Sequence, residues 1–153
     1  MARLHRAALW LAYRVLLVGW FVFRPRRHGV FVAVWHAGRV LAIRNSYRDW
    51  LALPAGGPKR GEAAVDTAVR ELREEVGITA PRAAFRFAVE IPSRFEYKRD
   101  RCSFFELDLA ERPAFRADGR EVVWADFVTP EEALGARLAP PVRSYLESRL
   151  ARS

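Results

Sequence analysis

The chain is poor in cysteine, in lysine and, over its first third, in acidic residues. Cys102 is the single cysteine among 153 residues, so no intramolecular disulfide can form, which fits a reducing compartment such as the cytoplasm. Lysine occurs only at Lys59 and Lys98, so arginine supplies nearly all of the positive charge. This use of arginine is typical of a genomic composition bias. An anionic partner (polyphosphate, nucleic acid or a lipid headgroup) is the functional alternative.

Acidic residues are absent before Asp49, although this part of the chain is rich in arginine. Its nine arginines are Arg3, Arg6, Arg14, Arg24, Arg26, Arg27, Arg39, Arg44 and Arg48. The rest of the chain contains 17 basic and 18 acidic residues, so the formal net charge of +8 comes from the N-terminal third. The length predicts one domain with its own core and is too short for two ordinary domains.

Residues 7–23 (AALWLAYRVLLVGWFVF) are apolar except for Arg14, and they predict a helix that Pro25 ends. No small-x-small cleavage site follows, which argues against a signal peptide. Three interpretations are open. The helix packs on its own domain or on a dimer partner, lies in a membrane interface with arginines at the headgroups, or spans the membrane. A central arginine is costly in a span. We expect a cytoplasmic protein, at the inner face of the membrane if the interfacial interpretation holds.

Apolar runs and turn residues predict a mixture of strands and helices. Strands are expected at 29–36, 40–44, 50–53, 85–91, 103–109 and 122–128, and helices at 62–76 and 141–150. The first two strands flank Ala37-Gly38 and predict a hairpin. Thr129 and Glu132 predict a capping box for a further helix, and Gly77 is expected just beyond the end of a helix. Without regular βα alternation, this order predicts an α+β fold with a mixed sheet.

Three carboxylates share one helical face, because Glu71, Glu74 and Glu75 are spaced at i, i+3 and i+4. Such a cluster is often only the solvated side of an amphipathic helix. Here a glycine-rich segment, 55–61, precedes it, and glycines allow the backbone to approach a ligand or metal closely. Carboxylate oxygens suit Mg²⁺ or Mn²⁺, and the lack of a histidine and cysteine cluster argues against zinc.

The segment 56–78 resembles the Nudix box, which is G, five residues, E, seven residues, then R-E-U-x-E-E-x-G-U with U aliphatic. Every specified position matches: Gly56, Glu62, Arg70, Glu71, Leu72, Glu74, Glu75, Gly77 and Ile78. The sequence 53–57 (LPAGG) resembles the L-P-G-G-G of many members, with Ala55 where glycine is common. We therefore expect a Nudix domain at 28–153 and an N-terminal extension at 1–27 that the resemblance does not explain.

The resemblance implies an α/β/α sandwich that hydrolyses the diphosphate of a nucleoside diphosphate linked to another moiety, with Mg²⁺ or Mn²⁺ as cofactor. It implies that the glutamates Glu71, Glu74 and Glu75 are metal ligands, aided by a backbone carbonyl near Ala55 or Gly56. Arg70 would orient the glutamates, and Glu62 would complete the loop–helix fold. A further carboxylate outside the box would be the base or an extra ligand. We favour Glu121 over the alternatives Asp118, Glu90 and Glu96.

Residues outside the box are expected to decide the substrate. The candidates for phosphate binding are Arg44, Arg48, Lys59, Arg60 and the loop 94–101, and those for stacking on a base are Tyr47, Trp50, Phe95 and Tyr97. Each is also consistent with a solvated charge or a core aromatic.

A small nucleotide, such as a nucleoside triphosphate or a sugar nucleotide, is the leading substrate class. The alternatives are the 5′ end of RNA and a membrane-linked diphosphate. The RNA alternative requires a basic surface continuous with the site, and most of the excess arginine lies in the extension, so nucleic acid is disfavoured. A non-enzymatic sensor is disfavoured because such proteins usually lose box glutamates.

Overall fold

A computed structural model describes residues 2–23, 26–94, 96 and 99–152. Within this part of the chain one sheet is formed by β1 (Arg26–His36), β2 (Arg39–Asn45), β3 (Ala55–Gly56), β4 (Arg86–Ser93), β5 (Arg99–Asp108) and β6 (Val122–Val128). The helices are α1 (Ala2–Phe23), α2 (Ala64–Val76), the 3₁₀ helix η1 (Arg82–Ala84), α3 (Pro130–Gly135) and α4 (Pro140–Leu150).

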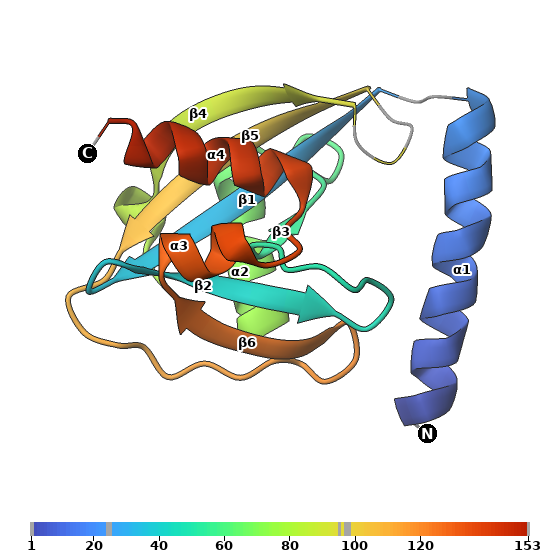
Figure 1. Ribbon diagram of the computed structural model, residues 1–153, viewed down its shortest axis with the longest axis horizontal. Helices are drawn as coiled ribbons and strands as arrows, with labels where there is room; N and C mark the ends of the chain where they lie inside the picture. The colour runs from blue at the N-terminus through green and yellow to red at the C-terminus, as the bar shows by residue number, and fades with distance from the viewer. Residues whose placement is uncertain (1, 24–25, 95, 97–98, 153) are drawn as a thin grey trace.

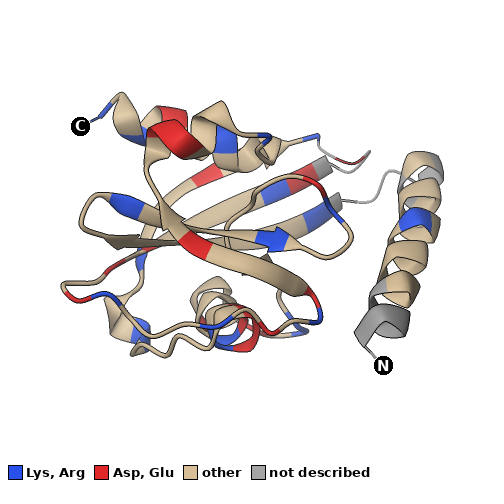
Figure 2. Cartoon of the chain, turned by 60° about the horizontal axis from the view of Figure 1, so that its bottom comes forward, with Lys and Arg blue, Asp and Glu red and all other residues tan. Residues whose placement is uncertain are grey.

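The sheet is mixed, as expected from the order of elements along the chain. Its strand order is β4-β5-β1-β2-β6, with β3 paired to β1. Strands β1 and β5 are parallel, and the other pairs are antiparallel. In Figures 1 and 2, α2 covers one face of this sheet, while α3 and α4 cover the other. The predicted α/β/α sandwich with a mixed sheet is therefore confirmed.

The helices are attached to the sheet by their apolar faces. Helix α2 buries Leu72 and Val76 completely, and α4 does the same with Tyr145 and Leu146. The Tyr145 ring stacks on Phe104 of β5, with ring centroids 4.7 Å apart. Burial of such side chains is the main favourable contribution to folding, so the core lies on both sides of β1 and β5.

Several helices and strands begin or end at residues other than those predicted, because their hydrogen-bonding partners decide where they start and stop. Strand β1 starts at Arg26, three residues before the predicted start, because it pairs with β5 from Arg26↔Arg99 onwards. The strand predicted at 50–53 is wrong as a strand, since Leu51 and Ala52 form only isolated bridges. Helix α2 begins at Ala64 and not at residue 62, because a turn closed by the Glu62 N–H and the Lys59 carbonyl precedes it.

The two predicted capping residues, Thr129 and Gly77, are confirmed. Thr129 Oγ1 accepts a hydrogen bond from the Glu132 amide at 3.1 Å, and Glu132 Oε2 accepts one from the Thr129 amide at 2.7 Å. This reciprocal pair is the capping box of α3. Gly77 ends α2 with a φ of 73°, in the left-handed region where glycine is favoured.

Helix α1 stands beside the rest of the molecule and starts at Ala2, five residues before the predicted start (Figure 1). Of its described side chains only Tyr13 is buried, with an exposed fraction of 9%. Among residues 2–23, 26–94, 96 and 99–152, no helix combines the length and the apolarity that crossing a membrane requires.

Candidate functional site

The glycine-rich segment lies directly against the glutamate face of α2. Strand β3 pairs with β1, and the Ala55 amide donates a hydrogen bond to Glu75 Oε2 at 3.0 Å. A Cβ at position 56 would lie 2.0 Å from Glu71 Oε1, so only glycine leaves room for the Glu71 carboxylate. Glu71 and Glu75 are therefore held against the backbone of residues 55 and 56.

Arg70 links the loop to the same helical face. Its Nε and Nη2 donate to the two carboxylate oxygens of Glu62 at 2.8 and 2.9 Å. Its Nη2 also donates to the Gly57 carbonyl at 3.0 Å, and its Nη1 contacts both Glu71 and Glu74. One guanidinium therefore contacts two of the three clustered carboxylates.

Glu62 closes the loop that precedes α2. Besides Arg70, it accepts hydrogen bonds from the Lys59 amide at 2.8 Å and from Thr67 Oγ1 at 3.0 Å. The hydrogen bonds from Arg70, followed by that from the Lys59 amide, lower the pKa of Glu62 to about 2. Glu62 is therefore ionised at neutral pH and holds the loop on the helix.

The three clustered glutamates differ in burial. Glu75 is 7% exposed, and the side-chain exposed fractions of Glu71 and Glu74 are 14% and 48%. Burial raises the pKa of Glu71 and raises that of Glu75 well above its usual range, and for Glu75 the neighbouring charge of Glu121 acts in the same direction. Carboxylates that ionise with such difficulty suit a site at which a cation offsets their charge.

The donor set fits a hard divalent cation, since it consists of carboxylate oxygens beside an exposed loop backbone. As they stand, no three acidic, histidine or cysteine side chains in the described part of the chain converge closely enough to enclose an ion. Arg70 explains why Glu71 and Glu74 do not converge on a common point. Its Nη1 bridges the two carboxylates and places a positive charge between them.

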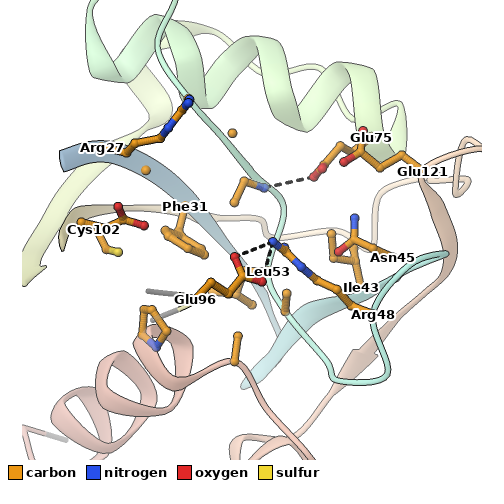
Figure 3. Close-up of a pocket in the computed structure, with 18 of the residues that line it drawn as sticks. Arg27, Phe31, Ile43, Asn45, Arg48, Leu53, Glu75, Glu96, Cys102 and Glu121 are labelled. Atoms are coloured by element: carbon orange, nitrogen blue, oxygen red, sulfur yellow. Dashed lines mark hydrogen bonds and ion pairs between the residues drawn. The ribbon is translucent and has the colours of Figure 1, made fainter. Parts of the chain in front are cut away.

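Glu121 lies beside Glu75 because hydrogen bonds attach the loop before β6 to the C-terminal end of α2. The Arg116 amide donates to the Val76 carbonyl at 3.0 Å, and the Asp118 amide to the Glu75 carbonyl at 3.3 Å. The Asp118 carboxylate accepts from the amides of residues 120, 121 and 122 and so shapes this loop. Figure 3 shows the side chains of Glu75 and Glu121 at one end of the pocket.

The other candidate bases are engaged elsewhere. Glu90 pairs with Arg101 at 2.9 Å, and Glu96 accepts a hydrogen bond from Arg48 at 3.0 Å. Glu121 Oε1 instead accepts a hydrogen bond from the Tyr47 hydroxyl at 2.6 Å. Burial raises the pKa of Tyr47, so its phenol stays protonated and continues to donate to Glu121.

A cavity of about 310 Å³ extends from these carboxylates into the molecule (Figure 3). Glu75, Glu121 and Gly56 line one end, and Arg48 and Glu96 line a side wall. Apolar side chains also line it: Phe31, Ile43, Leu53, Cys102 and Pro141. Phe31 stacks on Phe104 with centroids 4.8 Å apart, so the core holds its ring in place. The cavity therefore combines carboxylates at one end with a wall of both apolar and charged side chains.

The structure brings only some of the predicted substrate-binding residues to this cavity. Arg48 and Tyr47 line it. Arg44 lies in a separate hollow beside Trp124, because successive side chains of a strand alternate and those of Ile43 and Asn45 point into the cavity. Three other candidates, Lys59, Arg60 and Trp50, do not line it. Phe95 and Tyr97 lie outside the described residues.

Sequence reasoning missed Arg27, His28, Phe31 and Asn45, which also line the cavity. Asp100, which lies in the predicted loop 94–101, lines it as well. Phe31 reaches the cavity because it pairs with Ala55 across β1 and β3. No local pattern signals this pairing, since β3 is only two residues long.

Comparison with known proteins identifies the family. The family model described as NUDIX domain matches residues 20–148. Curated protein sequences give no significant match. Among solved structures, MutT protein from Methanosarcina mazei Go1 has a TM-score of 0.73 at 22% identity, covering 85% of this chain and 96% of that one.

Two further structures share the fold. The NUDIX domain of Shewanella oneidensis NrtR, complexed with ADP ribose, has a TM-score of 0.71 at 17% identity, with 86% of this chain and 90% of that one covered. A MutT/nudix family protein from Enterococcus faecalis has a TM-score of 0.61 at 19% identity over 67% of this chain, which spans only 43% of that protein. The chain belongs to the NUDIX domain family.

Proposed function

We propose that residues 28–153 form a Mg²⁺-dependent hydrolase that cleaves the diphosphate of a small nucleoside diphosphate linked to another moiety. One observation carries this proposal. Glu71 and Glu75 are pressed against the backbone of residues 55 and 56, and Glu75 and Gly56 line a cavity that also has apolar side chains in its wall. A diphosphate bound there leaves the rest of the substrate beside these apolar side chains.

In this proposal Glu71, Glu74 and Glu75 hold the metal together with the backbone near Gly56. Bound Mg²⁺, or Mn²⁺ in its place, neutralises charge on the phosphoryl oxygens and lowers the pKa of the attacking water. Arg70 would keep Glu71 and Glu74 in position through its contacts with both. Glu121 would accept the proton of the water, with its carboxylate oriented by the Tyr47 hydroxyl.

The cavity supports a small organic substrate in preference to a polymer. Its volume of about 310 Å³ lies at the lower end of the range of small-molecule sites. Phe31 offers a fixed aromatic face for a base, and Arg48 offers a positive charge at the wall. The complex of the similar NrtR domain with ADP ribose supports a nucleoside diphosphate joined to a sugar as the first class to test.

The test is hydrolysis of a panel of sugar nucleotides, nucleoside triphosphates and dinucleotides, with Mg²⁺ and with excess chelator. We expect turnover that needs the metal and that Glu74→Gln abolishes. Asp66→Asn is the matched control, because Asp66 lies on the same helix, pairs with Arg82 at 3.2 Å and is 45% exposed. Turnover that survives chelation would refute the metal role. Binding without hydrolysis would identify a sensor.

A second substrate class is favoured by a basic hollow next to the site. Arg27, His28, Arg94 and Arg101 line it, and it shares Arg27, His28 and Asp100 with the cavity. This is the continuous basic surface that the 5′ end of an RNA would need. If RNA is the substrate, Arg94→Gln should lower kcat/KM for 5′-triphosphate RNA and leave that for small nucleotides unchanged, with Arg152→Gln as control. Equal effects on both substrates would exclude RNA.

A further inference from the structure

The outer face of α1 is apolar and exposed. Six of the eight large hydrophobic residues that are exposed in the described part of the chain lie on this helix: Trp10, Leu11, Val15, Leu16, Val18 and Phe21. Their exposed fractions range from 48% to 66%. A helix that is apolar all round is normally buried, so this face requires a partner.

The orientation of α1 is set by the opposite side of the helix. The Tyr13 hydroxyl donates to Glu96 Oε1 at 2.5 Å, and the Arg48 guanidinium lies over the Tyr13 ring at 5.2 Å. Tyr13 also contacts the Tyr47 ring, with centroids 5.1 Å apart. Trp10, Leu16 and Phe21 lie about 60–80° around the helix from Tyr13 and flank its contact with the body. Leu11, Val15 and Val18 follow the i, i+4, i+7 spacing of a single face, each about 140–160° around the helix from Tyr13. They are therefore directed away from the body of the molecule.

Charge identifies the partner. Helix α1 contains three arginines, Arg3, Arg6 and Arg14, and no acidic residue, and Figure 2 shows a blue segment and no red on its described part. Arg14 lies among the exposed apolar residues, with its guanidinium over the Trp10 ring at 4.9 Å. In a pair of α1 helices two copies of Arg14 would meet with no acidic residue of either helix to pair with. At a lipid surface, in contrast, an arginine stem lies along apolar chains while its charge reaches a phosphate.

We propose that the outer face of α1 docks on a bilayer surface that contains anionic lipid, with the helix parallel to the membrane plane. A helix of 22 residues is about 33 Å long, so its apolar face offers several turns of contact. Each arginine near an anionic surface strengthens binding by about fivefold. Since Tyr13 contacts Arg48 and Tyr47, which line the site cavity, docking brings that cavity next to the lipid surface.

Sedimentation of the full chain with vesicles tests the proposal. The vesicles are pure phosphatidylcholine or an equimolar mixture with phosphatidylglycerol. We expect the protein to sediment with the mixed vesicles, more weakly with the neutral ones and less at high salt. The double variant Val15→Glu/Val18→Glu should weaken binding to mixed vesicles by about tenfold or more, because it places two carboxylates on the docking face. Both residues are exposed, so the fold is expected to persist, which circular dichroism checks.

Leu150→Glu is the matched control, because Leu150 is 40% exposed on α4, away from the docking face. It should bind vesicles as the wild type does. The proposal is overturned if the wild type ignores mixed vesicles, or if the double variant binds them equally well. It is also overturned if neither protein binds vesicles and light scattering shows that the wild type is a dimer while the double variant is a monomer. A second copy of the chain would then cover α1.

Discussion

Helix α2 buries Ala68, Leu72 and Val76 against the sheet and turns its glutamates towards a loop, whereas the one buried side chain among those described on α1 is Tyr13. Helix α1 is the more apolar of the two, yet it is the less buried. Its contact with the body depends on polar and ring contacts of Tyr13 with Glu96, Arg48 and Tyr47.

This difference shows that apolar composition alone does not bury a helix. The apolar residues of α2 recur on one side, so a single sheet face can cover them all. The apolar residues of α1 are distributed around the helix. The contacts of Tyr13 with the body cover one side of it, and the apolar residues elsewhere on the helix stay exposed. Burial in α2 also fixes the direction of its polar side, which is the property that a metal site needs. Five substitutions test this comparison.

The largest effect is expected for Glu75→Gln in α2. The amide can still accept the Ala55 hydrogen bond, so the fold should persist, but the charge at the metal site is lost. We expect kcat to fall about a thousandfold, corresponding to several kcal/mol of lost transition-state stabilisation. Steady-state kinetics measure this, with Asp66→Asn as the control on the same helix. An unchanged kcat would mean that the α2 face is only a solvated surface.

Truncation of a leucine in each helix compares their packing directly. Leu72→Ala should lower the free energy of unfolding by about 2–5 kcal/mol, because Leu72 is fully buried. Leu11→Ala in α1 should change it by less than about 0.5 kcal/mol, because Leu11 is 60% exposed. Urea denaturation measures both. A large loss for Leu11→Ala would show that α1 is buried against a partner in solution.

Gly56→Ala tests how closely β3 approaches the glutamate face. The added Cβ would lie 2.0 Å from Glu71 Oε1, so the carboxylate must move. A misplacement of a catalytic group by about 1 Å costs about a hundredfold in activity, and we expect a loss of this order. Gly135→Ala is the control, since a Cβ there meets nothing within 4 Å. If Gly56→Ala kept full activity, the position of Glu71 would not matter for turnover.

A small effect is expected for Tyr13→Phe on α1. It removes the hydrogen bond to Glu96 and should lower the free energy of unfolding by about 1 kcal/mol. Because Tyr13 lies outside the charged end of the cavity, kcat should stay unchanged. KM should rise, because Arg48 and Glu96, which line the cavity, lose a contact that holds them in position. A fall in kcat as large as that for Glu75→Gln would contradict the separation of the two helices.

The fold and the box were predictable to different extents. The spacing of Glu71, Glu74 and Glu75 follows from helical geometry, and the cap at Thr129 follows from four consecutive residues. Strand β3 was not predictable, because its two residues are strand only through pairing with Val30 and Phe31. Of the four single residues predicted to bind phosphate, only Arg48 lines the cavity. Arg44 lies in another hollow, because the face to which a strand side chain points depends on the register of its strand.

The sequence by itself determined the family, the layered fold and the three carboxylates on one helical face, because these depend on local periodicity and on a contiguous motif. The tertiary structure alone decided that Glu75 is buried and Glu74 exposed, that the loop at Asp118 places Glu121 beside them, and that α1 presents its apolar face outwards. Each of these features depends on contacts between residues that are distant in the chain, and local sequence patterns carry no information on such contacts.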